Sequence, residues 1–181
     1  TCALPIFSGA GGSIGSELCR QIVQAQPSTL LLVELSEFAL YEIHRELEAA
    51  LLDMSVHSEG ARFVKSPVLI PLLANIRDAH RIAEILRTWQ PATVYHAAAY
   101  KHVPLMENNP YEAIKTNVIG TRILSELASE VGVEKFVMVS TDKAVNPTNV
   151  MGATKRLAEM YTQSMNQIEG VKTKFIATRF G

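Results

Sequence analysis

The sequence predicts an α/β fold, a doubly wound parallel sheet with helices on both faces. Strand-like and helix-like stretches alternate along the chain, as they do in such folds. The run Thr29–Glu34 is mostly aliphatic, which is typical of a strand buried on both faces. The glycine-rich stretch SGAGGSIG follows the first expected strand and precedes the first expected helix. Together these observations indicate a Rossmann-type, NAD(P)-binding fold.

Six short apolar runs bounded by loop-forming residues predict the strands. They lie at residues 6–8, 29–34, 68–74, 93–97, 136–140 and 174–178. Pro71 sits inside the third run, and because proline cannot donate a hydrogen bond to a neighbouring strand, this strand is expected at an edge of the sheet. The strand order 3-2-1-4-5-6 of dinucleotide-binding folds places the third strand there.

Pro5 conflicts with that order, because the first strand is central in it. Either the strand begins at Ile6, or the residues before Ile6 are not native to this fold. The sequence leaves both interpretations open.

Five longer stretches, with apolar residues at intervals of three and four, predict the helices. They cover residues 13–25, 37–54, 78–90, 110–131 and 150–168. In the first stretch, Ile14, Leu18 and Ile22 share one face, and Ser36 is a favourable N-cap for the second. Residues 55–62, SVHSEGAR, are predicted to be loop.

The composition is that of an ordinary globular protein. The chain has 181 residues, 48% hydrophobic and 19% charged, with a net charge of −1, which predicts one domain over 1–181. No surplus of basic residues indicates nucleic-acid binding, and no apolar run is long enough to span a membrane. Cys2 and Cys19 make no disulfide framework, which fits a cytoplasmic setting. The chain lacks an initiator Met and stops just after a strand, so we interpret it as part of a longer protein.

The glycine loop predicts a phosphate-binding turn. Gly9, Gly12 and Gly15 have the spacing at which glycines permit a tight turn and let backbone N–H groups approach a pyrophosphate. Ser13 and Ile14 lie in the same loop, at the start of the helix, and are predicted to contact the cofactor. The alternative is a tight turn with a purely structural role.

Further cofactor contacts are expected where the next strands end. A carboxylate at Glu34 can accept hydrogen bonds from the adenosine ribose and would repel a 2′-phosphate, which favours NAD and leaves NADP open. Asn75 and Ile76 follow the third strand, where they can bracket the adenine. Three small residues after the fourth strand allow the backbone to lie close to a ligand. These are Ala97, Ala98 and Ala99.

His96 and His102 have no metal-ligand spacing with other histidines, cysteines or carboxylates. We expect both to be structural or to contact substrate, and we predict no metal site.

The fifth strand ends in a cluster of reactive side chains. Thr141, Asp142 and Lys143 stand at the carboxyl edge of the sheet, where ligands bind in open α/β folds. Lys155 is expected on the next helix, with Met151 one turn earlier on the same face. An ammonium at Lys155 can hold the ribose hydroxyls of a nicotinamide nucleotide.

Four motifs together resemble one enzyme family. They are GAGGSIGSELCRQI, HAAAYKHVPLMENNP, TNVIGT and STDKAVNPTNVMGATKR. The sequence resembles the nucleotide-sugar 4,6-dehydratases of bacterial polysaccharide biosynthesis, the CapD-like branch of the extended short-chain dehydrogenases, which act on UDP-N-acetylglucosamine. The resemblance covers the chain from Gly9 onward. It implies that bound NAD(P) takes hydride from C4 of the sugar, water leaves across C5 and C6, and hydride returns to C6.

The resemblance also implies the roles of individual residues. Asp142 would be the acid that protonates the departing 6-hydroxyl group, and Lys143 the base at C5. Thr141 would hydrogen-bond near the C4 oxygen, Lys155 would hold the nicotinamide ribose, and Asn117 would order the active-site helix. The substrate contacts implied in the YKH motif are Lys101 and His102.

Three positions depart from the family pattern. Ser8 replaces a threonine, Asn75 replaces an aspartate, and Met151 replaces the tyrosine that takes the C4 hydroxyl proton. A thioether cannot move a proton, so this proton must go to a water held by Thr141 and Lys155, or to Lys143. A base at Lys143 must be neutral, and we hypothesise that desolvation and Lys155 lower its pKa.

The resemblance further implies that the parent protein is cytoplasmic and forms a homo-oligomer. It also implies a C-terminal substrate lobe that this sequence lacks. Some relatives are anchored at the inner membrane. Two alternatives remain: a nucleotide-sugar 4-epimerase, which has no use for an acid–base pair at C5 and C6, and a non-catalytic NAD-binding module, which only Met151 supports.

Overall fold

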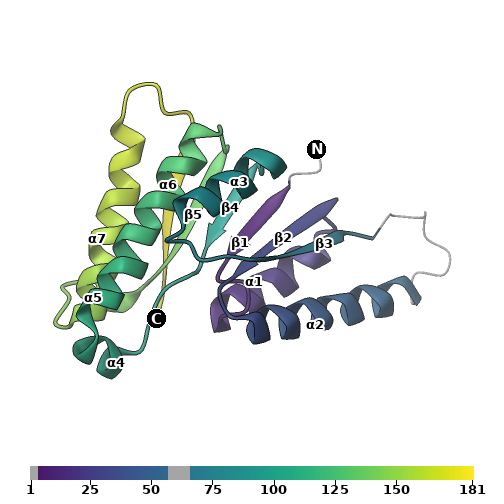
Figure 1. The fold of residues 1–181 in the computed structure, drawn as a ribbon, viewed down its shortest axis with the longest axis horizontal. Coiled ribbons are helices and arrows are strands. Elements are labelled where there is room, and N and C mark those ends of the chain that lie inside the picture. The colour runs from purple at the N-terminus through teal and green to yellow at the C-terminus, as the bar shows by residue number, and fades with distance from the viewer. Residues whose placement is uncertain (1–3, 57–65) are drawn as a thin grey trace.

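The computed structural model describes residues 4–56 and 66–181. Its centre is a parallel sheet in the order β3-β2-β1-β4-β5-β6, as predicted (Figure 1). The strands are β1 Pro5–Ser8, β2 Thr29–Glu34, β3 Val68–Leu73, β4 Thr93–His96, β5 Lys135–Thr141 and β6 Lys174–Phe180. The order reverses between β1 and β4, and the loops that follow these two strands therefore diverge and leave a crevice.

Helices cover both faces of the sheet. They are α1 Ser13–Gln24, α2 Glu37–Val56, α3 Ala79–Trp89, α4 Val103–Asn108, α5 Pro110–Ala113, α6 Thr121–Glu130 and α7 Val150–Ser164. Between them lie a short π-helix, Ile114–Gly120, and the 3₁₀ turn Asp142–Ala144. A second 3₁₀ turn, Met165–Gln167, follows α7. No helix in the described part of the chain is long and apolar enough to cross a membrane.

Alternate residues of the central strands β1 and β2 divide between two cores. Ile6 and Leu31 belong to the core under α3, α6 and α7, whereas Phe7 and Leu32 belong to the core under α1 and α2. This strict alternation follows from the two-residue period of a strand. Cys19 is fully buried in the second core.

The two prolines in strands lie where proline is tolerated. β3 is an edge strand, which confirms the prediction from Pro71. β1 begins at Pro5, which pairs with Thr93, and not at Ile6. A first residue can be proline because the ladder does not depend on its missing N–H group.

The predicted helix at 110–131 is wrong as a single helix. It consists of α5, the π-helix and α6. The Asn117 carbonyl, within the π-helix, accepts a hydrogen bond from the Thr121 hydroxyl at 2.7 Å. The short helix α4 was not predicted.

The other differences are at element ends. The fourth strand stops at His96, the fifth and sixth are longer than predicted, and the last helix gives way to a 3₁₀ turn after Ser164. In the predicted loop 55–62, residues 55–56 belong to α2, and residues 57–62 lie outside the described residues.

We expect Phe136→Ala to lower the free energy of unfolding by about 3–5 kcal/mol, because it empties a core position. Phe136 is fully buried, with its ring 5.3 Å from that of Phe175 and 5.9 Å from that of His96. The control is Phe38→Ala, since Phe38 is 74% exposed and its loss should change stability by about 0.5 kcal/mol or less. Urea unfolding measures both, and equal losses would contradict this placement.

Candidate active site

The backbone of the glycine loop lies close to the loop after β4. Gly9 has a φ of +75°, and a Cβ atom there would lie 2.6 Å from the Ala98 nitrogen. Its carbonyl accepts a hydrogen bond from the Gly12 nitrogen at 3.1 Å, which closes the turn before α1. Glycine at position 9 is therefore required by both conformation and space.

Two adjoining cavities open at this edge of the sheet. The larger, of about 470 Å³, holds most predicted site residues of the glycine loop, the YKH motif, the end of β5 and α7. These are Gly12, Ser13, Ile14, Gly15, Ala97, Ala99, Lys101, His102, Thr141, Lys143, Met151 and Lys155. The smaller, of about 180 Å³, is lined by Gly9, Gly12, Glu34, Asn75, Ile76, Ala97, Ala98 and Ala99. Asn117 and Asp142 are not among the residues that line either cavity.

Glu34 is a fixed negative charge on the wall of the smaller cavity. One carboxylate oxygen accepts a hydrogen bond from the Gly11 nitrogen at 3.1 Å. The other accepts from the nitrogens of Leu35 at 2.8 Å and Ser36 at 3.1 Å. Three backbone donors thus hold the carboxylate at the end of β2.

Asn75 and Ile76 stand at the end of β3, on the same cavity. The Asn75 side-chain oxygen accepts from the Arg77 nitrogen at 2.9 Å, and Ile76 is only 5% exposed. Arg77 in turn forms an ion pair with Glu112 at 2.7 Å.

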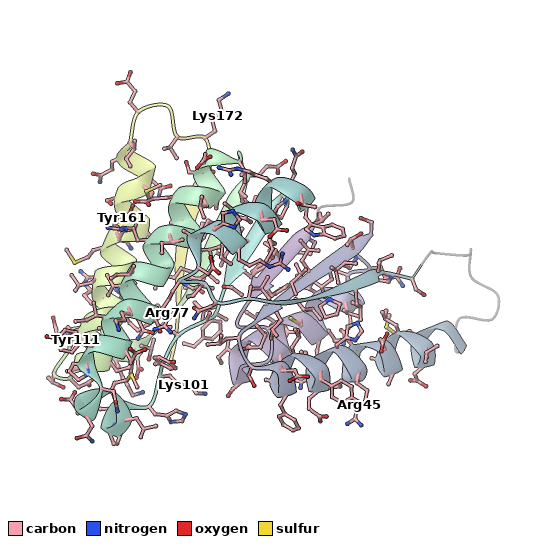
Figure 2. All side chains as sticks on the ribbon, viewed as in Figure 1. Arg45, Arg77, Lys101, Tyr111, Tyr161 and Lys172 are labelled. Carbon is pink, nitrogen blue, oxygen red and sulfur yellow. The ribbon has the colours of Figure 1, made fainter. Side chains whose placement is uncertain are left out.

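Lys101 spans the two walls of the larger cavity. It is on the loop between β4 and α4 (Figure 2). Its Nζ donates to the hydroxyl of Ser13, the first residue of α1, at 2.8 Å. His102 is the N-cap residue of α4 and lines the cavity beside it.

His96 does not face the cavities and has a structural role. It is 1% exposed, and burial lowers its pKa to about 3, so that the ring is neutral. The Thr121 hydroxyl already donates to the Asn117 carbonyl, so it must accept from His96 Nε2, at 2.8 Å. Nδ1 then accepts from the Ser8 hydroxyl at 2.7 Å.

Asn117 lies behind the cavity and ties two of its walls together. Its side-chain oxygen accepts from the Tyr100 nitrogen at 2.8 Å. Its side-chain nitrogen donates to the Tyr100 carbonyl and to the Thr154 hydroxyl, both at 3.0 Å. Thr154 donates to the Met151 carbonyl at 2.8 Å, so Asn117 connects the loop after β4 to α7.

Lys155 is a buried ammonium on the cavity wall. It is 5% exposed, and its Nζ donates to the Val139 carbonyl at 2.7 Å, which takes one of its three N–H groups. Burial lowers the pKa of Lys155 to about 8, against the opposing charge of Glu159. Met151, one turn earlier, is 2% exposed and packs with Met106 and Ala113, so its position is apolar.

Thr141, Asp142 and Lys143 form a connected group at the end of β5. The Thr141 hydroxyl donates to Asp142 Oδ1 at 2.9 Å, and Lys143 Nζ lies 3.4 Å from the same oxygen. The hydrogen bond from Thr141 and the charge of Lys143 lower the pKa of Asp142. Both side chains are more than half exposed.

The sequence did not single out the clamp between α7 and β6. Glu159 is fully buried and accepts from Arg179 at 2.9 and 2.7 Å, one bond to each carboxylate oxygen. Arg156 reaches the second oxygen at 3.2 Å. The bonds from Arg179 are the main reason that the pKa of Glu159 is lowered to about 2. The sequence signal that could have indicated this clamp is Glu159, a glutamate on the apolar face of the helix predicted at 150–168.

Known proteins resemble this chain over nearly its whole length. The capsular polysaccharide biosynthesis protein CapD of Staphylococcus aureus is 49% identical over 97% of this chain and 27% of its own length. The UDP-N-acetylglucosamine 4,6-dehydratase (inverting) of Campylobacter jejuni is 32% identical over 97% of this chain and 48% of its own. The UDP-glucose 4-epimerase of Rickettsia canadensis is 28% identical over the same shares. The chain therefore spans less than half the length of these relatives.

Solved structures share the fold. Pen from Bacillus thuringiensis superimposes with a TM-score of 0.79 at 28% identity, covering 100% of this chain and 52% of its own. DesIV, a dTDP-glucose 4,6-dehydratase from Streptomyces venezuelae with NAD bound, gives a TM-score of 0.75 at 22% identity, covering 97% of this chain and 55% of its own. Residues 6–181 also match a family described as polysaccharide biosynthesis protein. The chain belongs to this polysaccharide biosynthesis protein family.

Proposed function

We propose that the chain is the cofactor-binding part of a UDP-N-acetylglucosamine 4,6-dehydratase of bacterial surface polysaccharide biosynthesis. The observation that carries the proposal is one cavity that joins the glycine loop, the buried Lys155 and Lys143, whose Nζ lies 3.4 Å from Asp142 Oδ1. The relative from Campylobacter jejuni bears this activity in its name. Because the chain spans less than half of such relatives, the remaining sugar and uracil contacts belong to a lobe outside it.

The residues present fit a dinucleotide. The turn at Gly9 has no room for a side chain, and the two adjoining cavities share Gly12 between them. In this assignment the smaller cavity takes the adenosine, with Glu34 at its ribose, and the larger takes the nicotinamide. The fixed charge of Glu34 favours NAD over NADP. When bound, NAD supplies the acceptor and the donor of hydride.

Lys155 holds the nicotinamide ribose in this assignment. Val139 fixes its Nζ and leaves two N–H groups for ribose hydroxyls. A charged donor binds them more strongly than a neutral amine does, so the protonation state of Lys155 matters for cofactor affinity.

The Asp142–Lys143 pair performs the elimination. In this proposal the pair starts as an aspartate and an ammonium, and Asp142 Oδ1 and Lys143 Nζ lie 3.4 Å apart in the structure. A bound sugar that displaces water favours the neutral pair, which forms when the proton moves from Lys143 to Asp142. Lys143 then takes the C5 proton while Asp142 protonates the departing 6-hydroxyl group. Both residues end in the charge state in which they began, so the pair needs no outside proton.

The position of Met151 requires another path for the C4 hydroxyl proton. The thioether is buried against Met106 and Ala113 and offers no proton acceptor of useful strength. In this proposal the proton goes to a water between Thr141 and Lys155, or to the neutral amine of Lys143, which must then pass it to water before it takes the C5 proton.

Incubation of the full-length protein with UDP-N-acetylglucosamine should yield a product that has lost one water and carries a 4-keto-6-deoxy sugar. Lys143→Ala should lower kcat by about 100-fold or more, because the base at C5 is gone. Lys172→Ala is the control, since Lys172 is exposed and lies far from Lys101 (Figure 2). Mass spectrometry and NMR measure the product. Unimpaired dehydration by Lys143→Ala would refute the base, and inversion at C4 alone would establish an epimerase.

Affinity for NADH should fall about tenfold as pH rises through about 8, the pKa of Lys155. The ammonium is present below this pH and lost above it. NADH is the suitable probe, because its ring carries no positive charge to repel Lys155. Fluorescence titration at several pH values measures the affinity. Lys155→Met should bind weakly without this pH dependence, and a flat wild-type profile would contradict the assignment.

A further inference from the structure

The first turn of α7 is built around the backbone of Lys143. We propose that Gly152 and Glu107 are positioning residues, which hold this turn against Lys143 and thereby fix the proposed base relative to Lys155. The inference rests on the proposed dehydratase function, and it concerns two residues that touch neither the sugar nor the cofactor in that proposal.

Gly152 lets α7 approach the 3₁₀ turn Asp142–Ala144 more closely than any other residue would. A Cβ atom on Gly152 would overlap the Lys143 carbonyl oxygen and lie 3.2 Å from both the Lys143 carbonyl carbon and Pro147 Cβ. Gly152 is buried in the helix. Glycine is therefore required here for space, and an added methyl group must push the Lys143 backbone away.

Two side chains hold the same turn of α7 from outside. Asn149, the N-cap residue, accepts from the Gly152 nitrogen at 2.8 Å. Glu107 accepts from the Val150 nitrogen at 2.7 Å. Glu107 comes from α4, and its negative charge at the start of α7 is favourable to the helix dipole. Since α4 begins directly after His102, the same bond connects the YKH motif to α7.

The two lysines are thus fixed at two different points. Lys155 Nζ is bound to the Val139 carbonyl in β5, whereas the Lys143 backbone rests on Gly152. A change at position 152 displaces Lys143 and leaves the anchor of Lys155 in place. Elimination at C5 and C6 uses Lys143, and oxidation at C4 depends on the cofactor that Lys155 holds, so the change should separate the two steps.

The experiment is Gly152→Ala in the full-length protein with UDP-N-acetylglucosamine. The rate of water loss should fall about 100-fold, as expected for a misplaced catalytic group, while NADH affinity stays within about twofold. Rapid-mixing absorbance should still show reduction of the bound cofactor when the sugar is added. The control is Ala153→Ser, which also adds one heavy atom but at an exposed position of the same turn. It should leave both steps unchanged.

A second pair of variants tests the proposal if Gly152→Ala does not fold. Glu107→Ala removes the acceptor for the Val150 nitrogen and should slow water loss more than cofactor reduction. Glu107→Gln keeps an acceptor oxygen and should restore most of the loss.

The outcomes separate this inference from the proposed function. Equal loss of both steps in folded Gly152→Ala, or unchanged water loss, would overturn the positioning role alone. If Gly152→Ala does not fold, equal rates of water loss in Glu107→Ala and Glu107→Gln would likewise overturn the positioning role alone. A wild-type protein that binds NADH but removes no water from the sugar would overturn the proposed function and this inference with it.

Discussion

The arrangement of the site depends on one buried amide. The side chain of Asn117 makes three hydrogen bonds, two to the backbone of Tyr100 and one to Thr154. An aspartate would have no donors to offer, and a smaller residue would leave the Tyr100 backbone groups unsatisfied. Because Thr154 adjoins Lys155, this one side chain sets where the loop after β4 and the wall of α7 stand relative to each other.

Asn117 lies in the π-helix between α5 and α6, and its carbonyl accepts a hydrogen bond from the Thr121 hydroxyl. Thr121 is itself held by His96, whose neutral ring can accept from one neighbour and donate to the other. These hydrogen bonds allow only one tautomer of His96, the one with its proton on Nε2. A purely structural histidine thus supports the geometry of residues that do contact the cavity.

The sequence predicted the parts of this structure that follow from local pattern. The alternation of strand-like and helix-like stretches predicted a fold with this strand order. Pro71 predicted that β3 lies at an edge of the sheet. Thr141 and the glycine loop were predicted to share a site because the carboxyl ends of parallel strands meet at one edge. The cap from Glu107 could not be predicted, since Glu107 and Val150 are far apart in the sequence and become neighbours only after folding. The lowered pKa of Asp142 likewise depends on the final direction of the Thr141 hydroxyl.

The clamp between Glu159 and Arg179 has a consequence for the order in which the chain is made. Burying an ionised carboxylate without a partner costs several kcal/mol, and Arg156 reaches only one of its oxygens. Arg179 leaves the ribosome 20 residues after Glu159. Until β6 has emerged, α7 can dock only by leaving Glu159 incompletely paired or protonated. The helix that bears Lys155 can thus dock with Glu159 fully paired only when β6 is present.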